Sequence, residues 1–135
     1  MKVVAIADLH GFLPEIPECD LLLIAGDVCP VWNHHFEFQI LWLRSDFADW
    51  LKKVPAKSIV GIAGNHDFAL RKSGIGSNLP WIYLQDSETT VRGIKIWGSP
   101  WTPTYGNWAF MKEDWELKER WSHIPEDIDI LMTHG

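Results

Sequence analysis

The chain has 135 residues, of which 47% are hydrophobic, and this suits one globular domain with a buried core. Its 18 acidic and 12 basic residues give a formal net charge of −6. This charge argues against an extended nucleic-acid surface, because such affinity comes largely from Lys and Arg that neutralise phosphates. A phosphate substrate would need a metal to offset the charge.

Apolar runs in the first half of the chain predict an α/β core with parallel central strands. Residues 3–7 form a continuous run of β-branched and small residues, typical of a central strand buried on both faces. Further strands are expected at 21–25 and 58–63. Between them, apolar positions recur every three or four residues over 36–53, which predicts an amphipathic helix that ends before Pro55. The order strand, strand, helix, strand favours parallel pairing.

The second half of the chain predicts shorter elements. They are a short helix, three strands, a helix and a final strand, at 68–72, 81–84, 88–91, 94–97, 113–121 and 128–132. Arg92-Gly93 predicts a tight turn, so this segment is expected to be locally antiparallel. There is no internal repeat or linker, and we expect residues 1–135 to form a single domain.

The two cysteines and the N-terminus bear on the compartment. Cys19 and Cys29 have no close spacing, which favours small buried residues in a reducing compartment over a disulfide. The chain runs from Met1-Lys2 directly into a strand, without a signal-type apolar region. No apolar run approaches the roughly 18 residues that would span a bilayer. We therefore expect a cytoplasmic protein without a membrane partner.

Polar side chains follow four of the predicted strands. In chain order they are Asp8, His10, Asp27, Asn65, His66, Asp67 and His134. Because polar groups at the carboxyl ends of strands usually mark a site, we expect these side chains to meet at one edge. Oxygen and nitrogen donors without cysteine suit Mn²⁺, Fe or Zn²⁺ better than a structural thiolate site. Two ions about 3.5–4 Å apart can orient a phosphoryl group and lower the pKa of a bridging water.

Each of these motifs, taken alone, also has a structural explanation. Asp8-Leu9-His10 and Gly26-Asp27 are ordinary turn sequences. The turn Gly64-Asn65-His66-Asp67 could instead use its side chains to hydrogen-bond its own backbone. It is the combination of four clusters at strand ends that favours a site.

Other aromatic and histidine residues leave alternatives open. We expect His34 and His35 to be loop or helix-start residues that face water. Trp97, Trp101 and Trp108 lie on a loop-rich stretch. They could line the metal edge and stack on a nucleoside, or they could belong to the core.

The four clusters together resemble the successive motifs of the calcineurin-like metallophosphoesterases. The matching segments, in the right order along nearly the whole chain, are Asp8-x-His10, Gly26-Asp27, Gly64-Asn65-His66-Asp67 and Thr133-His134-Gly135. The stretches 96–103, 107–110 and 130–135 resemble the small metallophosphoesterase-domain proteins with phosphodiesterase activity. The resemblance implies a β-sandwich core flanked by helices and metal-dependent hydrolysis of a small phosphodiester or cyclic nucleotide.

The resemblance also implies two divalent metal ions, with Mn²⁺ first and Fe, Zn²⁺ or Co²⁺ as alternatives. Asp8 and His10 would bind the first ion, and Asp27 would bridge both. Asn65 and His134 would bind the second ion.

The catalytic residues implied by the resemblance are His66 and Asp67. His66 would contact the scissile phosphate and protonate the leaving oxygen, a role that suits an imidazole. Asp67 would hold that loop or orient His66.

Two departures from the family pattern qualify these roles. The last family motif, Gly-His-x-His, does not occur before the chain stops at Gly135, so we expect a C-terminally short domain with three protein ligands per ion. Weaker metal binding and slower turnover would follow. Pro30 stands where the protein serine/threonine phosphatases carry an aspartate, which argues against a phosphoprotein substrate.

A function of a different class is the alternative. The chain could be a catalytically weak or inactive scaffold of this fold that binds another protein. The missing histidine pair favours the scaffold, and the intact His66 opposes it. Expected partners are a small phosphodiester or nucleotide and, through an unpaired edge strand, a second copy in a homo-oligomer.

Overall fold

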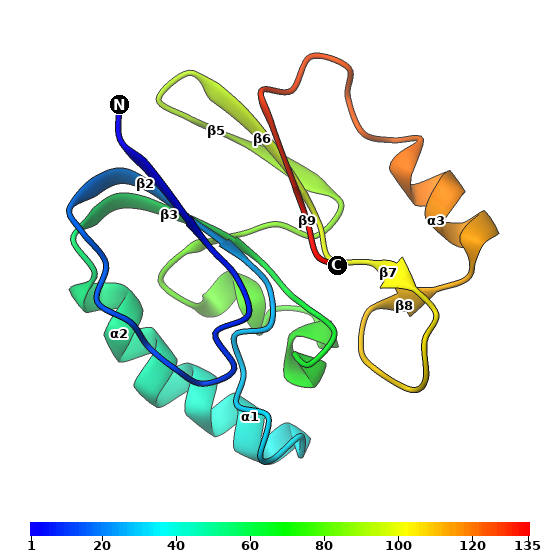
Figure 1. Ribbon diagram of the computed structural model, residues 1–135, viewed down its shortest axis with the longest axis horizontal. Coiled ribbons are helices and arrows are strands. Elements are labelled where there is room, and N and C mark those ends of the chain that lie inside the picture. Colours follow the sequence, from blue (N-terminus) through cyan, green and yellow to red (C-terminus); the bar gives the residue numbers. More distant parts are fainter.

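Four parallel strands form the first sheet of the computed structural model, which describes residues 1–135. In spatial order they are β1 (Val3–Ile6), β2 (Cys19–Ala25), β3 (Ala56–Ile62) and β4 (Ile82–Tyr83). Leu21 of β2 pairs with Val3 on one side and with Ser58 on the other. The first three strands therefore run side by side and end at the same edge, as the sequence predicted (Figure 1).

The second sheet has three strands. They are β5 (Ser87–Val91), β6 (Ile94–Ser99) and β9 (Ile130–Thr133), with β6 in the middle. The antiparallel β5–β6 pair is joined by Arg92 and Gly93, whose φ angles of 51° and 82° match a hairpin turn with two left-handed residues. Strand β9 pairs with β6 in parallel, although 30 residues separate them along the chain.

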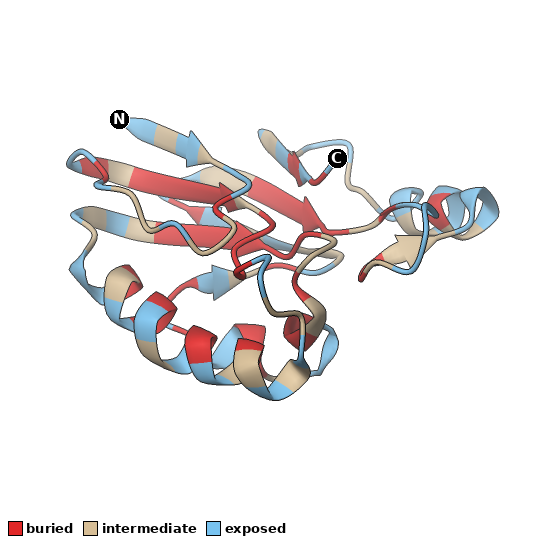
Figure 2. Cartoon of the chain, turned by 60° about the horizontal axis from the view of Figure 1, so that its bottom comes forward, coloured by how far each residue is buried: buried red, intermediate tan, exposed pale blue.

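The two sheets pack face to face. Eight buried side chains form the core between them: Leu21, Leu23, Val60, Ile62, Leu84, Val91, Ile96 and Met132. Alternate residues of β2 and β3 point into this layer, and the residues between them face the helices. Figure 2 shows the resulting band of buried residues along the central strands. The α/β class and the sandwich expected from the resemblance are confirmed.

A helical layer covers the outer face of the first sheet. It runs continuously through α1 (Phe36–Trp42), a π-helical turn (Leu43–Phe47) and α2 (Ala48–Lys53), confirming the predicted helix over 36–53. Four of its six buried side chains, Gln39, Leu43, Phe47 and Leu51, recur every four residues, and Trp42 and Ala48 lie beside them. Such spacing drifts around a helix of 3.6 residues per turn, and the wider π-helical turn compensates for the drift.

The remaining elements are short. Two 3₁₀ helices (Phe68–Arg71 and Gly76–Asn78) lie beside the first sheet, and a small parallel pair, β7 (Thr102–Pro103) with β8 (Met111–Lys112), leads to α3 (Asp114–Trp121). Helix α3 begins where the Glu116 side chain accepts a hydrogen bond from the backbone N–H of Glu113. Figure 1 shows α3 and the β7–β8 pair set to one side of the two sheets.

Strand β1 differs from its prediction as a central strand buried on both faces. It lies at the edge of the first sheet, where Val3 and Ala5 are exposed, and only Val4 and Ile6 pack against the helical side of the core. An apolar run shows that a segment is a strand, but the position in the sheet depends on which strands pair with it.

None of the helices combines the length and the apolar character needed to cross a membrane.

Candidate metal centre

The loops that follow β1, β2, β3 and β9 meet at one edge of the sandwich, which we call the strand-end rim. Backbone hydrogen bonds hold the first two loops together: the N–H of Asp8 donates to Gly26 O at 3.0 Å, and the N–H of His10 donates to Asp27 O at 2.9 Å. Parallel pairing of β1 with β2 brings the loops side by side. The part of the rim that comes from the first sheet therefore forms because neighbouring parallel strands end together, and the end of β9 joins it from the second sheet.

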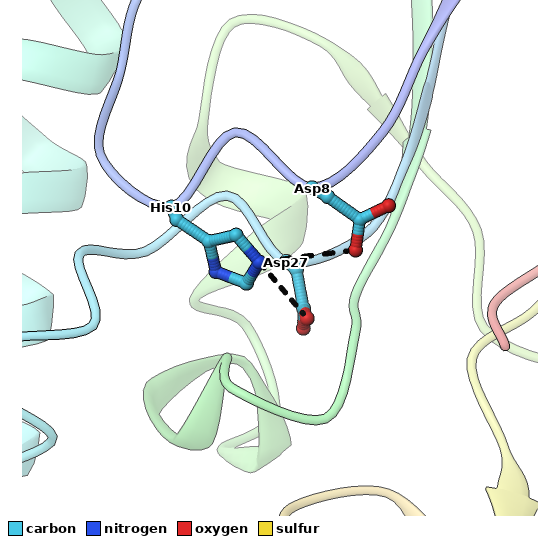
Figure 3. A group of neighbouring side chains, drawn as sticks. All are labelled: Asp8, His10 and Asp27. Atoms are coloured by element: carbon cyan, nitrogen blue, oxygen red, sulfur yellow. Dashed lines mark ion pairs between the residues drawn. The ribbon is translucent and has the colours of Figure 1, made fainter.

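Asp8, His10 and Asp27 form a group of potential metal ligands at this rim (Figure 3). One ligand atom from each lies within 4.8 Å of the others. Nε2 of His10 is 3.9 Å from Oδ1 of Asp8 and 3.8 Å from Oδ2 of Asp27. All three residues have left-handed backbones, with φ of 56°, 48° and 56°. This conformation costs roughly 1–2 kcal/mol per residue, and such strain concentrates at functional sites.

Two glycines allow the loops of the rim to approach each other. A Cβ on Gly64 would lie 2.2 Å from Oδ1 of Asp27. Gly26 has φ of +94°, and a Cβ there would lie 2.7 Å from Nδ1 of His134. A side chain at either position would displace a predicted metal ligand.

His134 reaches the rim from the end of β9. Its Nδ1–H donates to the carbonyl of Ala25 at 2.7 Å. Its Nε2 therefore faces the side-chain amide of Asn65 at 3.1 Å and Oδ2 of Asp27 at 3.3 Å. Burial acts to lower the pKa of His134, but the bonds to Asp27 and Ala25 outweigh it and raise the pKa to about 9. Nε2 of His134 thus points at Asn65 and Asp27, the two side chains that would hold a cation together with it.

Asp27 lies at the centre of the rim and is almost fully buried. Burial acts to raise the pKa of its carboxyl, yet the hydrogen bonds from His134 and from the backbone of His66 leave the pKa below its usual value. The N–H of His66 donates to Oδ1 at 2.8 Å, and Oδ2 faces both His10 and His134. Asp27 is therefore an anion with partners on two sides.

Asp67 lies beneath the rim with no exposed surface. Its carboxylate accepts hydrogen bonds from three backbone N–H groups: Gly64 at 2.8 Å, Cys29 at 2.9 Å and Val28 at 3.2 Å. Burial raises the pKa of Asp67, and these N–H groups act against the rise. The geometry supports the holding role among the expected ones, because Asp67 ties the loop after β2 to the loop after β3.

His66 lies beside the metal-ligand group. Its ring is 5.1 Å from that of His10 and 4.4 Å from that of Trp108, measured between centroids. Its Nδ1 is 3.0 Å from Nε2 of His34, and its own Nε2 makes no hydrogen bond within the protein. Burial is the main cause that lowers the pKa of His66; the carboxylate of Asp27 opposes it.

The structure brings all seven predicted site residues to the rim or directly beneath it. The expectation that His34 faces water is wrong: its ring is half-buried against His66, whereas His35 is exposed. Trp108 lies at the rim, but Trp97 is in the core, and Trp101 bonds to Asp86 away from the rim.

Gln39 also supports the site, and it was not among the residues predicted from the sequence. It is a fully buried polar residue that binds the His66 loop. Its signal in the sequence is its place in the otherwise apolar helical stripe that continues with Leu43 and Phe47.

The donor set fits a divalent cation. Two carboxylates and an imidazole converge from two loops. The separations of 3.8 and 3.9 Å between Nε2 of His10 and the carboxylate oxygens are a few tenths of an ångström longer than those of atoms that share a tetrahedral ion at about 2.0–2.2 Å, so a small inward movement would complete the contacts. On the other side of Asp27, Nε2 of His134 faces Oδ2 of Asp27 at 3.3 Å, so a further nitrogen donor lies next to the shared carboxylate. Because no cysteine thiolate is among these candidate ligands, the set suits harder metals.

Comparison with known proteins agrees with this geometry. A family model described as calcineurin-like phosphoesterase matches residues 1–135. Metallophosphoesterase domain-containing protein 1 of Homo sapiens, like that of Mus musculus, is 32% identical over 166 residues, covering 99% of this chain and 48% of the relative. A protein of Emericella nidulans named probable rhamnogalacturonate lyase C is 33% identical over 150 residues, covering 100% of this chain and 14% of that protein. The chain thus spans about half the length of its mammalian relatives, and it belongs to the calcineurin-like phosphoesterase family.

Proposed function

We propose that the chain hydrolyses a small phosphodiester, such as a cyclic nucleotide, with the help of two divalent cations, Mn²⁺ foremost. The family suggests metal-dependent hydrolysis of a phosphoester. The observation that supports two cations is the position of Asp27. Its Oδ2 lies 3.8 Å from Nε2 of His10 and 3.3 Å from Nε2 of His134, so two ligand groups meet at a single carboxylate.

The rim residues divide into two ligand groups around this carboxylate. Asp8 and His10 would hold one ion with Asp27, and Asn65 and His134 would hold the other with Asp27. When bound, the ions supply positive charge to the phosphoryl oxygens and lower the pKa of the attacking water. Nδ1 of His134, bonded to the Ala25 carbonyl, keeps Nε2 directed at the rim.

His66 would act on the leaving group. As the oxygen of water forms its bond to phosphorus, the bond between phosphorus and the leaving oxygen breaks. Nε2 of His66 delivers a proton to this oxygen, which departs as an alcohol. The backbone bond from His66 to Asp27 fixes this ring beside the ligand group. The lowered pKa of His66 makes its protonated form a stronger acid than free histidine.

Aromatic side chains around the rim support a nucleotide as the substrate. Trp108 packs against His66. The side chain of Trp32 is 69% exposed and lies against Gly11, the residue after His10. A Cβ on Gly11 would be 2.8 Å from the Trp32 ring. Exposed aromatic rings beside a phosphate site can stack on a base.

The test is hydrolysis of bis(p-nitrophenyl) phosphate by metal-stripped protein during titration with Mn²⁺. We expect Mn²⁺-dependent hydrolysis of this diester in preference to p-nitrophenyl phosphate. Asp27→Asn should lower activity at least about 100-fold, because it removes the carboxylate shared by both ligand groups.

Asp46→Asn is the matched control, since Asp46 is exposed on the helical layer. His66→Ala should lower turnover while Mn²⁺ still binds. Failure of the wild-type chain to hydrolyse the diester at any Mn²⁺ concentration would contradict the proposal and leave the scaffold as the alternative.

A further inference from the structure

His66 is held at two points by one short segment at the start of the helical layer, residues 34–39. Nε2 of His34 lies 3.0 Å from Nδ1 of His66. The amide of Gln39 donates to the carbonyl oxygen of His66 at 2.8 Å and accepts from the N–H of Ala69 at 2.9 Å. Because Gln39 is fully buried in α1, the backbone of the His66 loop is fixed relative to His34.

The ring of His34 is itself confined by aromatic neighbours. Its centroid lies 5.1 Å from that of His66, 5.5 Å from that of Phe68 and 5.5 Å from that of Trp108. Trp108 also contacts His66 at 4.4 Å, so both imidazoles pack against the same indole. This packing limits rotation of the His34 ring and therefore the groups that its Nε2 can reach.

The bond between the two rings decides which nitrogen of His66 can exchange a proton. In an imidazole, the hydrogen bond made by one nitrogen sets the protonation of the other. If Nδ1–H of His66 donates to His34, the second nitrogen, Nε2, carries the proton that can leave. Nε2 is also the nitrogen that makes no hydrogen bond within the protein.

We infer that His34 is a positioning residue for His66: its Nε2 accepts a hydrogen bond from Nδ1–H of His66 and so directs Nε2 of His66 to the leaving oxygen. The proton on Nε2 passes to that oxygen as the phosphorus–oxygen bond breaks, and His66 is left neutral with its remaining proton on Nδ1. This inference rests on the proposed function and adds a residue to it.

Three variants separate the hydrogen bond from packing. His34→Phe keeps an aromatic ring among Phe68 and Trp108 but removes the acceptor. His34→Gln keeps an amide near the position of Nε2 and tests rescue. His35→Ala is the matched control, because His35 is the neighbouring histidine, is exposed, and caps α1 without a side-chain hydrogen bond.

The kinetic test compares two diesters that differ in their need for a proton. Diphenyl phosphate releases phenol, with a pKa of about 10 like that of a tyrosine side chain, whereas bis(p-nitrophenyl) phosphate releases a much more acidic alcohol. We expect His34→Phe to lower kcat for diphenyl phosphate roughly 10–100-fold, with little change in KM and a much smaller effect on the nitrophenyl ester. His34→Gln should recover part of the loss, and His35→Ala should match the wild type.

A spectroscopic test does not depend on activity. In the whole, metal-free chain with ¹⁵N-labelled histidine, the neutral ring of His66 should carry its proton on Nδ1, and His34→Phe should shift it toward Nε2. The spectrum of His66→Ala identifies the signal.

The outcomes distinguish this inference from the proposed function. Equal losses with both diesters in His34→Phe, or no loss with either, would overturn the role of His34 while the diesterase activity stands. If the wild-type chain hydrolyses neither diester, the proposed function fails. The ¹⁵N spectra then test the hydrogen bond between His34 and His66 independently of activity. A proton on Nδ1 that moves in His34→Phe supports the hydrogen bond, and an unchanged spectrum overturns it.

Discussion

The buried carboxylate of Asp67 joins two loops of the rim through three backbone N–H groups. Asparagine at this position would offer only one acceptor oxygen and would turn its NH₂ group toward backbone donors. Leaving buried donors without partners costs the full desolvation of those groups. We expect Asp67→Asn to lower the free energy of unfolding by about 3 kcal/mol, measured by urea denaturation followed by tryptophan fluorescence.

The exposed Asp46→Asn serves as the comparison for this change, and its effect should stay within about 0.5 kcal/mol. If Asp67→Asn proved as mild as Asp46→Asn, the three N–H groups would have other acceptors, and the carboxylate would not be what joins the loops.

Sequence alone could predict that the candidate metal ligands meet at one edge, but not that His34 and Gln39 support the neighbouring His66 loop. Asp8, Asp27 and His134 each follow an apolar strand, so the pattern of strands predicts that they meet. His34 has no such pattern, because its partner His66 lies 32 residues away along the chain and the contact exists only after the helical layer has packed. Gln39 reaches the same loop over 27 residues.

Among the strands, Asp20 links the beginnings of β1, β2 and β3. Its carboxylate accepts from Nζ of Lys57 at 2.7 Å and from the backbone N–H of Lys2 at 2.8 Å. The bond from Lys57, followed by that from Lys2, lowers the pKa of Asp20 from 3.8 to about 2. A carboxyl with a lowered pKa stabilises the fold above its unfolded pKa, and this contribution is lost as pH falls through the folded value.

We therefore expect the wild type to melt at a higher temperature than Asp20→Asn at pH 6, and the difference to vanish as pH falls from about 4 to about 2. Thermal melts followed by circular dichroism at a series of pH values measure it. Glu18→Gln, an exposed change two residues away, should show no such pH-dependent difference. A constant difference between wild type and Asp20→Asn down to pH 2 would rule out the carboxylate as its cause.

Elements with a clear local signal in the sequence were the ones that could be predicted. The helix over 36–53 and the β5–β6 hairpin follow from a long apolar stripe and from Arg92-Gly93, which are local signals. The edge position of β1 and the parallel pairing of β6 with β9 were not predictable in this way. Both depend on contacts between distant segments, which local patterns do not record.

For the whole molecule, metal binding should raise stability, since a ligand that binds only the folded state stabilises it by mass action. At about 100 times the dissociation constant of Mn²⁺ the gain is about 2.7 kcal/mol, or on the order of 10 °C in melting temperature for a chain of this size. Differential scanning fluorimetry with and without Mn²⁺ measures the shift. Asp8→Asn should reduce the shift, and Asp27→Asn should abolish it.

The Asp46→Asn chain should keep the full shift, because Asp46 lies on the helical layer away from the rim. An equal rise in Asp27→Asn would mean that Mn²⁺ stabilises the protein somewhere other than the rim.

The bond from His134 to the Ala25 carbonyl spans 109 residues of the 135-residue chain. Closing so long a loop is entropically costly, and contacts of this kind tend to form late on the folding pathway. The proposed second ligand group, which includes His134, is therefore complete only when β9 has docked on β6. Metal capture should follow folding rather than nucleate it, and its kinetic benefit should appear as slower unfolding rather than faster folding.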